Sequence, residues 1–192
     1  LASLNDSQGE DVCRRIVTHE EYWYVVENLM LDENKMLQRS TLELLSNLMG
    51  HPRPIAVKFF NFDNPRSEKN FEILVKLLEL EDLESQRAVA AIFANISTSI
   101  PFVAQELLKR TDLLTKAVDV LHNQISDVEL SERLILLFHA LTDVIPDDHP
   151  EMGSFLMGNT KLIKSLEQAS QMPDIGPHFA ELIPITLERC QR

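Results

Sequence analysis

The chain has 192 residues, of which 44% are hydrophobic and 25% are charged. That is enough apolar material for the core of one domain of ordinary size, and it excludes an intrinsically disordered chain. Lys and Arg number 18 against 30 Asp and Glu, so the formal net charge is −12 at pH 7. So acidic a chain is a poor candidate for nonspecific binding to nucleic acid or to an anionic membrane, since both need concentrated positive charge.

The two cysteines, Cys13 and Cys190, stand at opposite ends of the chain. They form neither a disulfide framework nor a metal-binding spacing, which is typical of a protein in a reducing compartment. No apolar run approaches the length of a membrane span, and no basic start leads into one. We therefore expect a cytoplasmic protein that contacts neither nucleic acid nor membrane.

Apolar residues recur every three or four positions, which predicts helices, and no period-two pattern or hairpin signal predicts a strand. Four amphipathic helices of medium length are expected at Glu20–Leu31, Glu68–Leu80, Thr111–His122 and Thr160–Ser170. Short segments precede them at Val12–Val17, Ile55–Phe60, Phe102–Leu108 and Met152–Met157, and a long helix closes each unit. Pro184 interrupts the last apolar stretch, which predicts a kinked or split helix there. The fold class is all-α.

The long helices repeat. Gln38–Leu48 and Gln86–Ile96 share a Gln-Arg pair, an apolar pattern and a closing Asn-aliphatic pair, 48 residues apart. A looser third copy falls into register 45 residues further on, if Ala140 takes the place of the asparagine. Three helices per unit at this period predict an armadillo or HEAT-like α-solenoid, in which each unit buries its apolar faces against its neighbours.

About four units fit the chain, at roughly 9–50, 51–98, 99–146 and 147–192. Residues 1–8 are expected to be the end of a truncated preceding unit, because the chain starts without Met in an apolar stretch. The whole chain is thus interpreted as one solenoid segment of a longer protein.

In such a stack the third helices line a concave groove, and equivalent positions form a ladder along it. Asn47 and Asn95 occupy one such position, and an amide can both donate to and accept from the backbone of a bound peptide. Glu43 shares the face of Asn47, one turn earlier, and Arg39 and Arg87 recur two turns before the asparagines. These five residues are the predicted partner-binding groove. The asparagines could instead cap neighbouring carbonyls, and the arginines could form solvated charges or salt bridges between units.

No residue is nominated for catalysis, for a cofactor or for a metal. Asp147, Asp148 and His149 lie between two prolines without further ligands at helical spacing, so a polar turn is favoured over a metal site. Two aromatic clusters contain more rings than one helical face can bury. They are Tyr22 with Trp23 and Tyr24, and Phe59 with Phe60 and Phe62. At least one ring of the first cluster is expected at the surface.

Several stretches resemble the C-terminal armadillo repeats of the UCS-domain proteins, which are chaperones of the myosin motor domain. They are Leu1–Ser3, Val12–Ile16, Val26–Met30, Gln38–Glu43 and Ser46–Leu48. The divergent tail looks more like a fungal member. Glu43 and Asn47 match the family's Thr-Glu and Asn-Leu signature, although Leu42 replaces the threonine. Asn95 is matched only by repeat register, and Ala140 departs from the pattern.

The resemblance implies a chaperone or co-chaperone module, not an enzyme, that needs no cofactor. It implies binding of the myosin motor domain in a solenoid groove, in support of myosin folding and actin-based motility. Hsp90 is a further candidate partner, through the full-length protein. The alternative is a generic armadillo adaptor that binds an extended basic peptide. Such adaptors usually carry Trp one turn before each Asn, whereas Glu43 and Ala91 stand there.

Overall fold

The computed structural model describes residues 11–191 except 13, 17, 50–55, 57 and 147. The predictions for residues 1–8, Cys13 and Asp147 therefore lie outside the described part. The α-helices are α2 (Glu20–Met30), α3 (Lys35–Leu48), α5 (Pro65–Glu79), α6 (Leu83–Ser99), α7 (Pro101–Leu108), α8 (Thr111–Asn123), α9 (Val128–Asp143), α10 (Thr160–Ala169) and α11 (Pro177–Gln191). A 3-10 helix, η1, covers Pro150–Gly153. No strand occurs among these residues.

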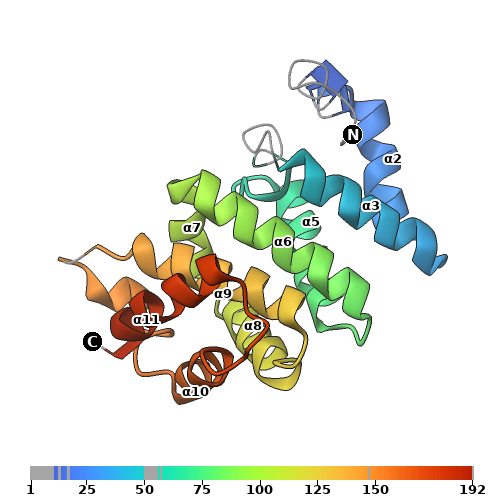
Figure 1. Ribbon diagram of the computed structural model, residues 1–192. Helices are drawn as coiled ribbons and strands as arrows, with labels where there is room; N and C mark the ends of the chain where they lie inside the picture. The colour runs from blue at the N-terminus through green and yellow to red at the C-terminus, as the bar shows by residue number, and fades with distance from the viewer. Residues whose placement is uncertain are drawn as a thin grey trace.

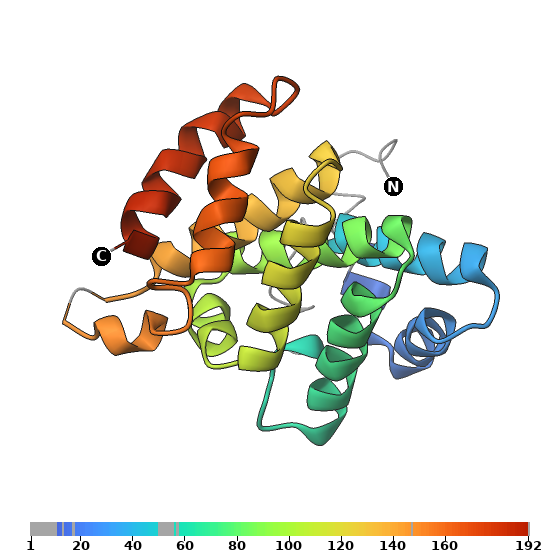
Figure 2. The ribbon, with the colours of Figure 1, turned by 90° about the horizontal axis from the view of Figure 1, so that it is seen from below.

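The helices form two rows. The long helices α3, α6, α9 and α11 pack successively against one another and cross the molecule in Figure 1. The medium helices α5, α8 and α10 form the second row, which Figure 2 shows side by side in green, yellow-green and orange. Each medium helix also packs on the long helix that follows it. This is the stacked arrangement of a solenoid, so the predicted all-α fold class is confirmed.

Helix starts follow from local side-chain chemistry. Four helices begin after an Asx residue whose side-chain oxygen accepts a hydrogen bond from a free backbone N–H of the first turn. These residues are Asn34, Asn64, Asp127 and Asn159. Pro65 and Pro101 each occupy the first helical position, where a missing N–H has no consequence. The four medium helices α2, α5, α8 and α10 start and end within three residues of their expected bounds.

The core is continuous from unit to unit. Phe60, Phe71 and Phe93 come from three different elements, and their rings meet at centroid distances of 5.9 to 6.3 Å. Phe59 joins them and contacts Trp23 edge-on at 5.3 Å. Trp23 is fully buried, while its neighbours Tyr22 and Tyr24 are 51% and 62% exposed. The expectation that at least one ring of the cluster of Tyr22, Trp23 and Tyr24 lies at the surface is therefore confirmed.

The fourth unit departs from the expected layout in its first segment. Met152–Met157 was expected to form a short segment like α7, but only the single 3-10 turn η1 and a run of turns occur there. Gly153 lies so close to the preceding unit that an added Cβ would stand 2.3 Å from Ile145 Cδ1. Gly153 thus packs against the Ile145 side chain at a distance that leaves no room for a side chain of its own.

Of the helices in the described part, none alone has the length and hydropathy to cross a membrane. The helices α6 and α7 reach that threshold only together, and a bend of 119° separates them.

The last helix runs unbroken through Pro184, so the expected split does not occur. Pro184 and Ala180, one turn earlier, are both exposed. The carbonyl of Ala180, which would accept from the N–H that proline lacks, can therefore bond to water.

Replacing Pro184 by alanine should stabilise the chain, because an interior proline costs a helix up to about 3 kcal/mol. We expect a net gain of about 1–2 kcal/mol, or a rise in Tm of about 3–6 °C by thermal denaturation. Pro177→Ala is the matched control, since Pro177 opens α11 and should give no increase. A lower Tm for Pro184→Ala would show that the ring is needed for packing.

The contact between α9 and α11 includes a half-buried histidine. His139 Nδ1 lies 3.2 Å from Thr186 Oγ1. Burial lowers the pKa of His139, and the charges of Arg189 and His178 lower it further, against the opposing charge of Asp143. The folded chain therefore holds this imidazole neutral at pH values where the unfolded chain protonates it.

Stability should consequently fall as the pH drops below the ordinary histidine pKa of about 6.5, since the unfolded state then binds more protons. His139→Asn keeps a polar group near Thr186 but removes the titration. Its free energy of unfolding should depend less on pH between about 5 and 7 than that of the unchanged chain, as measured in urea. Equal pH slopes for the two proteins would exclude His139 as the cause.

Candidate functional site

A polar pocket of about 260 Å³ crosses three consecutive long helices. We call it the trench. Its lining consists of Glu43, Ser46 and Asn47 from α3, Glu84, Arg87 and Ala88 from α6, and Glu129 and Arg133 from α9. Three of the five predicted groove residues, Glu43, Asn47 and Arg87, therefore come together. Arg39 and Asn95 are not part of its lining.

The register of the repeat explains why these positions align. In α3 and α6 the glutamine of the Gln-Arg pair is buried and reaches back to the end of its own unit's medium helix. Gln38 Nε2 donates to the Met30 carbonyl at 2.9 Å, and Gln86 Nε2 donates to the Leu78 carbonyl at 3.1 Å. In α9 Ser131 makes the corresponding contact, from its hydroxyl to the Ile125 carbonyl at 3.1 Å. Equivalent residues thus join α3 and α6 to the preceding medium helix, and α9 to the turn that follows α8.

The arginine of the pair reaches forward to the next unit. Arg39 Nε donates to Asp82 Oδ2 at 3.1 Å, and Arg87 Nε donates to Asp127 Oδ1 at the same distance. Both aspartates stand at the N-cap of the next long helix. Hydrogen bonds from Arg39 lower the pKa of Asp82, and those from Arg87 lower the pKa of Asp127. The salt-bridge interpretation of these arginines is therefore the one that the geometry favours.

The third unit keeps this forward contact with different chemistry. Glu132 stands at the register position of Arg39 and Arg87. Its Oε1 accepts a hydrogen bond from the Gly176 backbone N–H at 2.7 Å, immediately before α11. We refer to the three contacts, at Arg39, Arg87 and Glu132, as the inter-unit clamps. Two of them, at Arg39 and Arg87, join α3 to α6 and α6 to α9, which are the helices that line the trench.

The polar side chains of the predicted groove that take no part in the inter-unit clamps belong mainly to α3. Glu43 and Asn47 are exposed, and the described residues offer neither side chain an ion pair or hydrogen bond. Asn95 is half-buried and likewise has no side-chain partner among the described residues. Ala140, at the same position of the third unit, is only 6% exposed. The asparagine ladder therefore thins out toward the C-terminal units.

Charge in the trench is unbalanced. Arg87 lies 3.0 Å from Glu84 and 3.5 Å from Glu129, and Arg133 pairs with Glu129. The lining thus contains two guanidinium groups and three glutamates. Of these three glutamates, Glu43 is the one that has no counter-ion among the described residues. The trench can therefore offer a partner an uncommitted amide, an uncommitted carboxylate and a slightly negative field.

The remaining candidates from the sequence are dispersed. Asp148 and His149 are exposed, and His149 Nδ1 lies 3.0 Å from Glu151 Oε1. Within the described residues, no group of three or more His, Cys, Asp or Glu is placed to hold a metal ion. Burial raises the pKa of the Cys190 thiol to about 11, which keeps it protonated at neutral pH.

Sequence reasoning missed the acidic partners of the clamps and the α9 wall of the trench. Asp127 carried a usable signal, because an Asp just before an apolar helical stretch indicates an N-cap. Nothing in the sequence, however, indicated that this N-cap would also receive Arg87 from the preceding unit. Glu129 and Arg133 lie in the loosest copy of the repeat, where register alone could not assign a face.

Two comparisons place the chain among known proteins. It is 54% identical over 190 residues to SWI5-dependent HO expression protein 4 of Saccharomyces cerevisiae, a match that covers 98% of this chain and 24% of that protein. It is also similar to the crystal structure of She4p, with a TM-score of 0.92 and 52% identity over 98% of this chain and 26% of the She4p chain. No protein-family model matches the chain.

These similarities confirm the resemblance noted in the sequence. This chain belongs to the UCS family. It spans about a quarter of the length of the relatives it matches. The trench lies on the long helices that the repeat register had assigned to the groove.

The clamp between α6 and α9 can be measured separately from the N-cap that it contacts. Arg87→Ala and Asp127→Asn each break the ion pair, whereas Asp127→Ala also removes the side-chain acceptor for the Leu130 N–H. We expect each ion-pair variant to cost about 1–2 kcal/mol of unfolding free energy, and Asp127→Ala to cost about 1 kcal/mol more.

Chemical denaturation of the single and double variants measures these terms, and the Arg87–Asp127 coupling energy should reach at least about 0.5 kcal/mol. Glu43→Gln is the control, since Glu43 has no ion pair among the described residues, and it should leave stability unchanged. Additive effects of Arg87→Ala and Asp127→Asn would refute the clamp.

Proposed function

We propose that this chain forms part of the client-binding surface of a myosin-directed chaperone, and that the trench contacts the myosin motor domain. The observation that carries the proposal is the convergence of Glu43, Asn47 and Arg87 from two stacked helices in one open pocket. Membership of the UCS family supports the choice of client. The chain has no catalytic step in this proposal, and it acts in the cytoplasm.

The trench is suited to a client segment that is extended or incompletely folded. An asparagine side chain can pair with both the N–H and the C=O of a peptide backbone, whatever the client's side chains are. Asn47 lines the trench and Asn95 lies outside its lining on the neighbouring helix α6, so a segment that extends beyond the trench could meet both amides. The clamps keep the binding surface rigid, which lowers the entropy lost on the chaperone side.

Affinity at the trench is expected to be modest. Ordering a flexible client segment costs free energy that offsets the contacts it makes. Modest affinity suits a chaperone, because the client must leave once it has folded. Any step driven by ATP is assigned to a partner, and Hsp90 is the proposed one, through the full-length protein.

A second candidate function is recognition of an extended basic peptide by a general adaptor. The negative balance of the trench and the free carboxylate of Glu43 favour it. The two candidates differ in which group matters. A chaperone groove that grips backbone depends on Asn47 and Asn95, whereas an adaptor for basic peptides depends on Glu43.

The test is suppression of light scattering from heat-stressed myosin motor domain by the full-length protein without nucleotide. Asn47→Ala combined with Asn95→Ala should weaken suppression about ten-fold, because two bifunctional backbone contacts are lost. Asn28→Ala is the matched control, since Asn28 is an exposed asparagine of the medium helix α2, and it should have no effect.

Circular dichroism must show unchanged helicity for the double variant. Full suppression by that variant would remove the two asparagines from the binding surface. Loss of suppression with Glu43→Gln alone, together with binding to a polylysine peptide, would favour the adaptor instead.

A further inference from the structure

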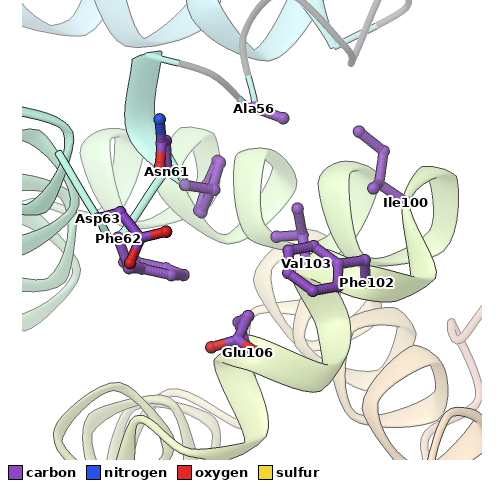
Figure 3. A pocket seen from close by; sticks show the side chains of 9 residues that line it. Ala56, Asn61, Phe62, Asp63, Ile100, Phe102, Val103 and Glu106 are labelled. Atoms are coloured by element: carbon purple, nitrogen blue, oxygen red, sulfur yellow. The ribbon is translucent and has the colours of Figure 1, made fainter.

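A second pocket, of about 370 Å³, lies outside the trench and shares no residue with it. We call it the edge pocket. One wall is the turn that precedes α5, with Phe62 and Asp63, and the other is the start of α7, with Ile100, Phe102, Val103 and Glu106. Figure 3 shows the two walls facing each other across an open space. The family membership of the chain assigns no role to it.

The first wall is held in place by aromatic packing. The backbone turns where Asn64 N–H donates to the Asn61 carbonyl at 2.9 Å. The Phe62 ring meets Phe71 edge-on at 5.3 Å, and the Arg110 guanidinium lies 4.8 Å from its centroid. Phe62 is therefore fixed in one position while it lines the pocket, and so it presents a preformed apolar surface.

The second wall depends on the sharp bend between α6 and α7. Ile100 is extended, Pro101 starts α7, and the two helices are bent by 119°. This geometry buries Val103 and leaves Phe102 on the outside, 65% exposed. A large aromatic side chain on a rigid helix beside a hollow is typical of an anchor at a protein interface.

The two charged residues in the lining of the edge pocket are both acidic. Asp63 and Glu106 line it from opposite walls, and no Lys or Arg is part of the lining. Glu106 pairs with Lys109 at 2.6 Å, but this is a helical i,i+3 pair whose lysine is 59% exposed. Exposed pairs of this kind are weak, so a cation from a partner can replace Lys109.

We propose that the edge pocket binds a short segment of a protein partner in which an apolar side chain is flanked by Lys or Arg. The apolar side chain lies between Phe62 and Phe102, and the flanking cations meet Asp63 and Glu106. Charge complementarity selects this occupant, because an apolar segment without a cation would leave Asp63 uncompensated and Glu106 with only its weak pair to Lys109. This site acts independently of the trench and of the client that binds there.

The test uses methyl-labelled chain and two synthetic pentapeptides, Gly-Arg-Leu-Arg-Gly and Gly-Glu-Leu-Glu-Gly, with blocked ends. The Arg peptide should shift the NMR signals of the Ile100 and Val103 methyl groups in a saturable manner, and the Glu peptide should not. Phe102→Ala should weaken binding of the Arg peptide about ten-fold. Asp63→Asn combined with Glu106→Gln should abolish the difference between the two peptides.

Phe102 is mostly exposed, so its replacement should leave the Tm unchanged, and the lost affinity is then not a folding defect. Met36→Ala is the matched control, because Met36 is another exposed apolar residue, 75% exposed on α3, and it should bind the Arg peptide normally. Equal shifts with both peptides, no shift up to about 10 mM, or full affinity of Phe102→Ala would each overturn the proposal. A dimer that Phe102→Ala disperses, seen by sedimentation, would overturn it in favour of a second copy of the chain.

Discussion

The structure depends on the packing of each long helix between its two neighbours. The central helix α6 shows this most clearly, since 11 of its residues are buried between α3, α9 and the medium helix α5. Small side chains such as Ala88 and Ala91 let the helices approach closely, and Ile92 and Phe93 fill the space on the other sides. Because no unit can bury these faces alone, the order of the stack also determines which side chains are left for the groove.

Much of the fold could be predicted from the spacing of apolar residues and from the residues that start and end helices. The bounds of α8 agree with the expected ones to within a residue, because Thr111 and Leu113 begin a strongly amphipathic stretch between polar turns. The η1 region could not be predicted in this way. Gly153 approaches the Ile145 side chain closely there, which is a contact between units and leaves no periodic signal.

The candidate site, too, could be predicted from the sequence only in part. The repeat register predicted Glu43 and Asn47 at the groove surface, because a polar side chain without a partner on a repeated helix face is normally exposed to solvent. Register could not separate Arg39 from them, because a clamp and a groove residue recur with the same period. Only the position of Asp82 in the next unit distinguishes the two roles, and that position depends on how far successive helices are staggered.

The third unit explains why the repeat became hard to recognise there. Ser131 and Glu132 replace the Gln-Arg pair, and yet both contacts persist, one back to Ile125 and one forward to Gly176. The serine reaches a carbonyl six residues away, in the turn before α9, whereas each glutamine reaches one eight residues away, in the preceding medium helix. Glu132 reverses the sign of the clamp, and a backbone N–H becomes its partner in place of an aspartate. What repeats in this solenoid is therefore the pair of contacts, whereas the Gln-Arg identity is kept in α3 and α6 and lost in α9.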